Sequence, residues 1–171
     1  MKRRFLGFLL GMACLALLIP AGAAWGFTIG QTTGLPLPRF VSLRADEVNL
    51  RTGPGLRFPI EWVYTRKNLP VEIIAEYNVW RKVRDWQGTE GWVYESMLSS
   101  RRMMVVMDKP RKLLASDNGH ARTVAIIDPG VIGRLVHCPG GDPYCQVDID
   151  GIQGWLPRGQ IWGVLPGERV G

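Results

Sequence analysis

Residues 87–94 of the chain read QGTEGWVY, and residues 150–157 read DGIQGWLP. Each stretch has a Gly-Trp pair followed by an aliphatic residue, and each has another glycine three positions before the glycine of that pair. Counted from Gly91 to Gly154, the two copies lie 63 residues apart. Ordered features that recur at one spacing indicate a small module written twice.

The segments before the two Gly-Trp pairs also correspond. Trp80 aligns with Tyr144 at an offset of 64, so one hairpin differs in length by one residue between the copies. Further upstream, LPVEIIAEY at 69–77 and PGVIGRLVHC at 129–138 each combine a turn with an aliphatic strand. The shared order of these features favours duplication over chance.

The apolar stretches of both copies are short and rich in Val and Ile. They are separated by turn-forming segments such as TGPG, RKNLP and WQGTEG, which is typical of an all-β domain with many short strands. In the first copy we expect strands at 47–51, 60–64, 70–77, 79–85 and 90–94. The pattern predicts two small β-barrels in tandem, at 43–100 and 103–165, because a barrel removes the exposed edges of so small a sheet. Residues 24–42 show little periodicity, and we expect them to form a flexible leader.

The N-terminus resembles a secretory signal. Met-Lys-Arg-Arg precedes an apolar run from Phe5 to Ile19, and small residues follow, with Ala21 and Ala23 forming an Ala-x-Ala site. We therefore expect residues 1–23 to be a signal peptide cleaved before Ala24, and the mature chain to be periplasmic or secreted. An uncleaved N-terminal anchor is the alternative, although the run is short for a membrane span.

The charge of the chain is modest once the expected signal is removed. The whole chain has 21 basic and 15 acidic residues, and loss of Lys2, Arg3 and Arg4 leaves 18 basic residues against 15. These charges are scattered along the sequence, so nucleic-acid binding is not expected. Association with a membrane is expected to be peripheral at most.

Two of the three cysteines lie in the second copy. Cys138 and Cys145 bracket the turn-forming residues Pro-Gly-Gly-Asp-Pro-Tyr. In an oxidising compartment such a pair is expected to form a disulfide that closes the turn. A metal site is the alternative, but His137 is the one further soft ligand nearby, and a fourth ligand is missing. We expect neither a metal nor a cofactor.

The stretch VNLRTGPGLRFPIEWVYTRKNLPVEIIAEYNVWRKVRDWQGTEGWVYESML at 48–98 resembles a bacterial Src-homology-3-like domain. The resemblance lies in the Asn-Leu-Arg-Thr-Gly-Pro opening, the Gly-Leu-Arg-Phe-Pro-Ile loop, the Trp-x-x-Val strand and the closing Gly-Trp-Val. The second copy diverges and has KLLASDNGHA in place of the opening. This resemblance implies a small barrel found mainly in exported proteins, where such domains accompany cell-wall enzymes and bind peptidoglycan or peptides. It does not imply an activity.

Catalytic residues are sparse. After removal of the signal the chain keeps His120 and His137, and both lie in the second copy. Ser116 and Asp117 are close to His120 in sequence, but all three crowd a turn without a nucleophile elbow. We therefore expect a non-catalytic protein.

Side-chain parity suggests where a ligand would bind. Because side chains alternate along a strand, Trp80 and Val83 cannot both face the core without a bulge. If Val93 points inward, Trp92 and Tyr94 point outward. We expect these exposed aromatic residues to form a shallow groove beside Arg51, Arg81 and Arg84. The candidate ligand-binding residues are Arg51, Trp80, Arg81, Trp92 and Tyr94.

Two hypotheses follow for the function. In the first, the chain is an exported binding module of the cell envelope that recognises a peptidoglycan peptide or a partner protein through the aromatic surface of its first barrel. In the second, it is a structural or assembly protein, and its aromatic residues are buried between the barrels or against a partner. For Trp62, which alternates with Ile60 and Tyr64, we expect a packing role. The sequence predicts no oligomeric state.

Overall fold

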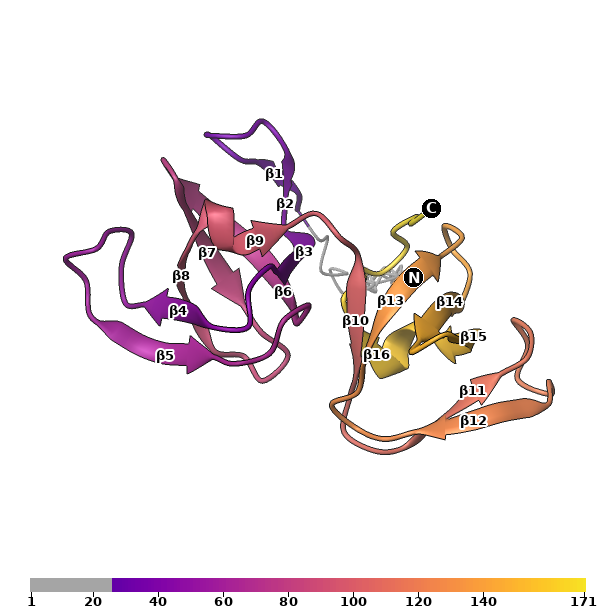
Figure 1. The fold of residues 1–171 in the computed structure, drawn as a ribbon. Helices are drawn as coiled ribbons and strands as arrows, with labels where there is room; N and C mark the ends of the chain where they lie inside the picture. The colour runs from indigo at the N-terminus through magenta and orange to yellow at the C-terminus, as the bar shows by residue number, and fades with distance from the viewer. Residues whose placement is uncertain (1–25) are drawn as a thin grey trace, which may run out of the picture.

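The computed structural model describes residues 26–171, and these form strands and two short 3-10 turns (Figure 1). The predicted signal peptide at 1–23 lies outside the described residues. Two seven-stranded antiparallel sheets follow one another along the chain, preceded by a small two-stranded sheet. Within residues 26–171, no helix has the length and apolar character needed to cross a membrane.

The two large sheets have the same topology. The first has the strand order β5-β4-β8-β7-β6-β3-β9, and the second has the order β12-β11-β15-β14-β13-β10-β16. Each strand of the second sheet therefore corresponds to the strand of the first sheet whose number is lower by seven, so that β11 corresponds to β4 and β14 to β7. The prediction of an all-β chain with two barrels of one design is confirmed.

Five strands of the first barrel, β4 to β8, agree with the expected ranges to within one residue at each end, and β3 and β9 were not expected as strands. The strands of this barrel are β3 (Arg39–Leu43), β4 (Val48–Arg51), β5 (Ile60–Tyr64), β6 (Pro70–Tyr77), β7 (Trp80–Arg84), β8 (Glu90–Tyr94) and β9 (Leu98–Ser99), with the 3-10 turn η1 (Glu95–Met97) before β9. The strands of the second barrel are β10 (Met103–Val106), β11 (Arg111–Leu114), β12 (Thr123–Ile127), β13 (Ile132–His137), β14 (Tyr144–Ile149), β15 (Ile152–Pro157) and β16 (Ile161–Trp162), with η2 (Arg158–Gln160) before β16.

The register of the strands confirms the predicted alignment of the two copies. Trp80 lies opposite Tyr94 on neighbouring strands, and Tyr144 lies opposite Pro157 in the same way. The sheets also share their irregularities. A bulge after Leu50 on β4 corresponds to one after Leu113 on β11. A second bulge, on β6 and β13, also occurs in both copies.

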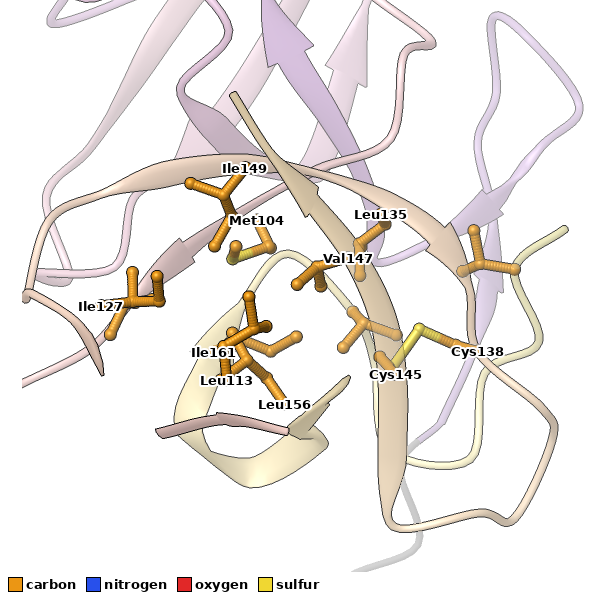
Figure 2. Close-up of a cluster of buried hydrophobic side chains, with 13 residues drawn as sticks. Met104, Leu113, Ile127, Leu135, Cys138, Cys145, Val147, Ile149, Leu156 and Ile161 are labelled. Carbon is orange, nitrogen blue, oxygen red and sulfur yellow. A yellow bond between two sulfur atoms is a disulfide. The ribbon is translucent and has the colours of Figure 1, made fainter. Parts of the chain in front are cut away.

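Each barrel has its own hydrophobic core. The core of the first barrel is made by Leu37, Leu43, Val48, Leu50, Tyr64, Leu69, Val71, Ile73, Val83, Val93 and Leu98. Figure 2 shows the core of the second barrel, in which Leu113, Val147 and Leu156 lie close together and the Cys138–Cys145 disulfide closes one end. The two cores share no buried residue, so each barrel has its own interior, and Ile132 of β13 packs against the edge of the first core.

The expectation of a flexible leader at 24–42 is wrong from Gly26 onward. This segment forms a hairpin of β1 (Thr28–Ile29) and β2 (Pro36–Leu37) and then β3, which pairs with both β6 and β9. Leu37 and Phe40 are buried. The long-range pairing of β3 stabilises this segment, and its own composition gives no sign of that pairing.

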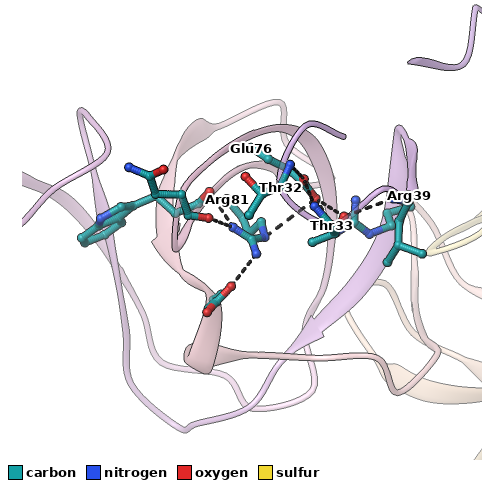
Figure 3. A network of polar contacts seen from close by, with 9 residues as sticks. Thr32, Thr33, Arg39, Glu76 and Arg81 are labelled. Carbon is teal, nitrogen blue, oxygen red and sulfur yellow. Dashed lines mark hydrogen bonds and ion pairs between the residues drawn. The ribbon is translucent and has the colours of Figure 1, made fainter. Parts of the chain in front are cut away.

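Glu76 holds the hairpin against the first barrel (Figure 3). Its buried carboxylate accepts hydrogen bonds from the Thr32 and Thr33 N–H groups, from the Thr33 hydroxyl and from Arg39. Burial alone would raise the pKa of Glu76, but the bonds from Thr33, Arg39 and Thr32 outweigh it and lower the pKa to about 2. The hairpin is therefore fixed by a charged group of β6.

The disulfide predicted between Cys138 and Cys145 is present, and both residues are fully buried. The backbone of Cys138 exchanges two hydrogen bonds with Val170 near the C-terminus. Arg158 strengthens this corner because its guanidinium donates to the backbone oxygens of Pro139, Asp142, Leu165 and Glu168. The second barrel thus extends beyond the expected end at 165, to Val170.

The two barrels touch through a small set of contacts. The rings of Phe40 and Trp162 meet edge to face with their centroids 5.1 Å apart. Arg66 of the first barrel donates to the Gly130 carbonyl of the second at 2.7 Å. Arg102, in the connection between the barrels, pairs with Glu168 at 2.6 Å. These contacts fix the first barrel against the second.

Candidate functional site

Three neighbouring strands of the first barrel, β4, β8 and β7, carry the predicted site. Their inward side chains include Leu50, Val93 and Val83, which are completely buried. Successive side chains of a strand point to opposite faces, so the residues between them point outward. The outward residues include Asn49 and Arg51 of β4, Trp92 and Tyr94 of β8, and Trp80 and Lys82 of β7.

A shallow groove of about 220 Å³ lies on this outward face. Arg51, Trp80 and Tyr94 line it, as expected. Four further lining residues were not among the predicted ones: Glu47, Asn49, Leu56 and Met97. Leu56 and Met97 come from the loop after β4 and from η1, and a strand-parity argument does not place loop residues. Tyr94 and Leu56 are exposed, at 41% and 78% of their surface.

Trp80 forms the base of the groove and is not exposed. Only 7% of its surface is accessible, which corrects the expectation of an exposed indole. Parity places it outward, as predicted, but the Tyr94 ring packs on it edge to face with a centroid distance of 5.4 Å. A large ring on a small sheet is covered by its neighbours in this way. Tyr94 is thus the aromatic residue of the groove that a ligand can reach most directly.

Arg81 is not part of this surface, and its expected exposure is wrong. It points to the same side as Val83 and Val93, and 4% of its surface is accessible. Its guanidinium donates to the Asn78 and Trp80 carbonyls and pairs with Glu95. A buried guanidinium needs such partners, so Arg81 has a structural role. Arg84 pairs with the buried Glu72 at 2.6 Å.

Arg51 and Trp92 lie beside each other on the outward face. Arg51 is half-buried, and its Nη1 donates to the Leu56 and Phe58 carbonyls, at 3.3 and 2.8 Å. It therefore holds the loop that forms one wall of the groove. Trp92 is half-buried opposite Arg51 on one side and Lys82 on the other. The structure brings Arg51, Trp80, Trp92 and Tyr94 to one face and separates Arg81 from them.

Trp62 has 56% of its surface accessible, so the expected packing role is wrong. It lies on β5, at the edge of the first sheet, where only one neighbouring strand is available to cover it. A second, smaller depression of about 140 Å³ lies between Trp62 and Trp86. At its edge, the buried Tyr64 hydroxyl donates to Asp85 at 3.0 Å.

The residues considered for catalysis are engaged in a turn. The Asn118 side chain donates to the Ser116 hydroxyl oxygen and accepts from the His120 N–H group. Among residues 26–171, no three His, Cys, Asp or Glu side chains gather in an arrangement that could hold a metal ion. The Asn118 side chain therefore stabilises the turn through local hydrogen bonds.

The family comparison concerns the first barrel. Residues 44–100 match the family model of the bacterial SH3 domain. The bacterial SH3 domain is a binding module and not a catalytic domain. The match covers the strands of the bacterial SH3 module from β4 to β9, and so includes every lining residue of its groove. No curated protein matches the chain.

Two solved structures are similar to the chain at low identity. They are NlpC2 and NlpC1 from Trichomonas vaginalis, each 10% identical, with TM-scores of 0.33 and 0.34. The matches cover 73% and 78% of this chain and 48% of each of those chains. The chain thus spans about half the length of these two structures.

Proposed function

We propose that the chain is an exported binding protein of the bacterial cell envelope, and that its bacterial SH3 module binds peptidoglycan peptides or a protein partner at the groove above Trp80. The observation that carries the proposal is the combination of the family match with an exposed Tyr94 ring on a groove between Glu47 and Arg51. The signal-like N-terminus supports export.

The groove offers three kinds of contact. The Tyr94 ring and the Leu56 side chain present apolar surface for an aliphatic or aromatic group. Asn49 supplies an amide that can donate and accept hydrogen bonds. Glu47 and Arg51 carry opposite charges, and neither forms an ion pair with a described residue. A short peptide that carries both an amine and a carboxylate is complementary to this set.

Retention on insoluble peptidoglycan tests the proposal. The unaltered protein should sediment with purified cell walls, and Tyr94→Ala should reduce the bound fraction. Tyr94 is an exposed residue at the end of β8, so its truncation should leave the barrel folded. Trp62→Ala is the matched control because it removes an exposed aromatic residue outside the groove. No retention, or equal retention of Tyr94→Ala and the parent, would count against the proposal.

Assembly with a protein partner is the second candidate. Phe27, Ile29 and Leu35 are exposed apolar residues on the N-terminal hairpin, and Glu76 holds this hairpin in place. Phe27 also lines a cleft of about 510 Å³ that reaches Leu165 and Pro166 of the second barrel. Fixed apolar surface of this kind favours a partner. The variant Ile29→Ser separates the candidates, because it should weaken association with a partner and leave retention on cell walls unchanged.

A further inference from the structure

The second barrel has a groove in the same place as the first. Its volume is about 300 Å³, and it lies on the outward face of β11, β15 and β14, the strands that correspond to β4, β8 and β7. The groove is lined by Pro110, Arg111, Lys112, Leu114, Gly119, Tyr144, Pro157 and Gln160. The duplication has therefore preserved the groove as well as the fold.

The correspondence extends to single residues. Tyr144 takes the position of Trp80, and Pro157 takes the position of Tyr94, since each pair lies opposite one another on neighbouring strands. Lys112 lies one residue before the core residue Leu113, as Asn49 lies before Leu50. These positions are fixed by the shared register of the two sheets.

The chemistry of the two grooves differs. The groove of the first barrel is lined by one acidic and one basic residue, Glu47 and Arg51. The groove of the second barrel is lined by two basic residues, Arg111 and Lys112, and by no acidic residue. In the first barrel the Tyr94 ring covers Trp80. In the second barrel the position of Tyr94 is taken by Pro157, which has no aromatic ring, and Tyr144 is half-buried rather than buried.

Neither basic residue has an acidic partner in the part of the chain that the structure describes. Lys112 is exposed, and it takes part in no ion pair within residues 26–171. The buried Nε atom of Arg111 has no hydrogen-bond acceptor in the described part of the chain, and its Nη2 reaches the Met107 carbonyl only at 3.5 Å. The positive charge of this groove is therefore available to an anionic ligand.

The backbone of Tyr144, which also lines the groove, is anchored by its neighbours. Its backbone N–H donates to the Asp142 carboxylate at 2.9 Å, and the next residue, Cys145, is fixed by the disulfide to Cys138. The Tyr144 ring and the Lys112 side chain line the same groove. A ring and a cation in one groove can bind an apolar group and a carboxylate of one ligand.

We propose that the groove of the second barrel is a second binding site, and that it takes a peptide segment bearing carboxylates. Lys112 contacts the carboxylate, and Tyr144 packs against the neighbouring part of the peptide. The site does not depend on what the first groove binds, because its residues all belong to the second barrel.

Amide NMR spectra of the whole protein test this site. The probe is acetyl-Ala-Glu-Ala with a free C-terminus, and the matched control is acetyl-Ala-Gln-Ala-amide, which has no carboxylate. At millimolar concentrations the acidic peptide should shift amide resonances of β11, β14 and β15, and the neutral peptide should not. Lys112→Gln should weaken binding about fivefold, which corresponds to about 1 kcal/mol.

Lys109→Gln is the control variant, because Lys109 is an exposed lysine close in sequence that does not line the groove. It should retain the parent affinity. The proposal is overturned if the second barrel shows no shifts, if both peptides shift it equally, or if Lys112→Gln and Lys109→Gln behave alike. Shifts confined to the first barrel would support its groove and overturn the second site, so the two proposals fail separately.

Discussion

Gly91 lies so close to Leu50 that a Cβ atom at Gly91 would be 2.5 Å from the Leu50 Cγ atom. Gly154 stands in the same relation to Leu113, at 2.6 Å. In both barrels the glycine of the Gly-Trp pair thus lets one strand cross closely over a core leucine. The repeated glycines therefore have a packing role.

Substitution of either glycine should destabilise the barrel that contains it. Gly91→Ala forces Leu50 or the nearby Arg51 carbonyl to move, and we expect a loss of about 1–3 kcal/mol in the free energy of unfolding. Gly154→Ala should do the same in the second barrel. Gly159→Ala is the control, because a Cβ there meets no atom within 4 Å. Urea unfolding measures the three variants, and equal stability for all of them would contradict this packing role.

Glu76→Gln should detach the N-terminal hairpin. The neutral amide cannot balance the charge of Arg39, and we expect a loss of roughly 2–4 kcal/mol. Hydrogen exchange at Thr32 and Thr33 should become faster. Glu61→Gln, at an exposed position on β5, should leave both amides protected.

The same interaction should depend on pH. Because the pKa of Glu76 is lowered from 4.5 to about 2 in the folded chain, its contribution to stability is present above pH 4.5 and is lost as the pH falls toward 2. The stability difference between the parent and Glu76→Gln should shrink over this range. A difference independent of pH would contradict the role of the charge.

Removal of the disulfide should weaken the second barrel. In Cys138→Ser/Cys145→Ser the short loop is no longer closed, and we expect a loss of about 2–3 kcal/mol. The first barrel contains no part of the disulfide, so the backbone amides of its core should keep their hydrogen-exchange rates. A reducing agent should destabilise the parent and have no effect on the double variant.

Tyr64 should stay neutral in strong base. Burial, the Asp85 charge and the hydrogen bond to Asp85 all raise the pKa of Tyr64 above its ordinary value of 10.0. The unfolded chain ionises first, so the contribution of Tyr64 to stability is complete below pH 10 and declines above it. The phenolate absorbance of the parent and of Tyr64→Phe is measured as the pH is raised. The difference between the two curves should show no ionisation of Tyr64 near pH 10.

Local patterns were enough to predict most of the strands and the duplication. The alternation around Val83 and Val93 is a property of each strand alone, and it placed Trp80, Trp92 and Tyr94 outward as observed. The disulfide was also predictable, since its two cysteines are close in sequence.

Long-range partners account for most of the errors. Arg81 lies two residues before the inward-facing Val83, so parity itself places it inward, and only its pairing with Glu95 makes a buried guanidinium acceptable there. Strand β3 follows a Pro-rich segment and shows little alternation, and its pairing with β6 and β9 arises only in the folded chain. Exposure of Trp62 depends on β5 being an edge strand, which is a property of the sheet order.

The position of β3 bears on how the first barrel can be produced alone. The family match begins at residue 44, immediately after β3 ends at Leu43. A fragment cut at that boundary lacks the strand that joins β6 to β9, along with the Arg39 anchor for Glu76 and the Phe40 ring. Such a fragment would have an open seam beside Val71 and Ile73 and would tend to aggregate, whereas one beginning at residue 26 keeps the seam closed.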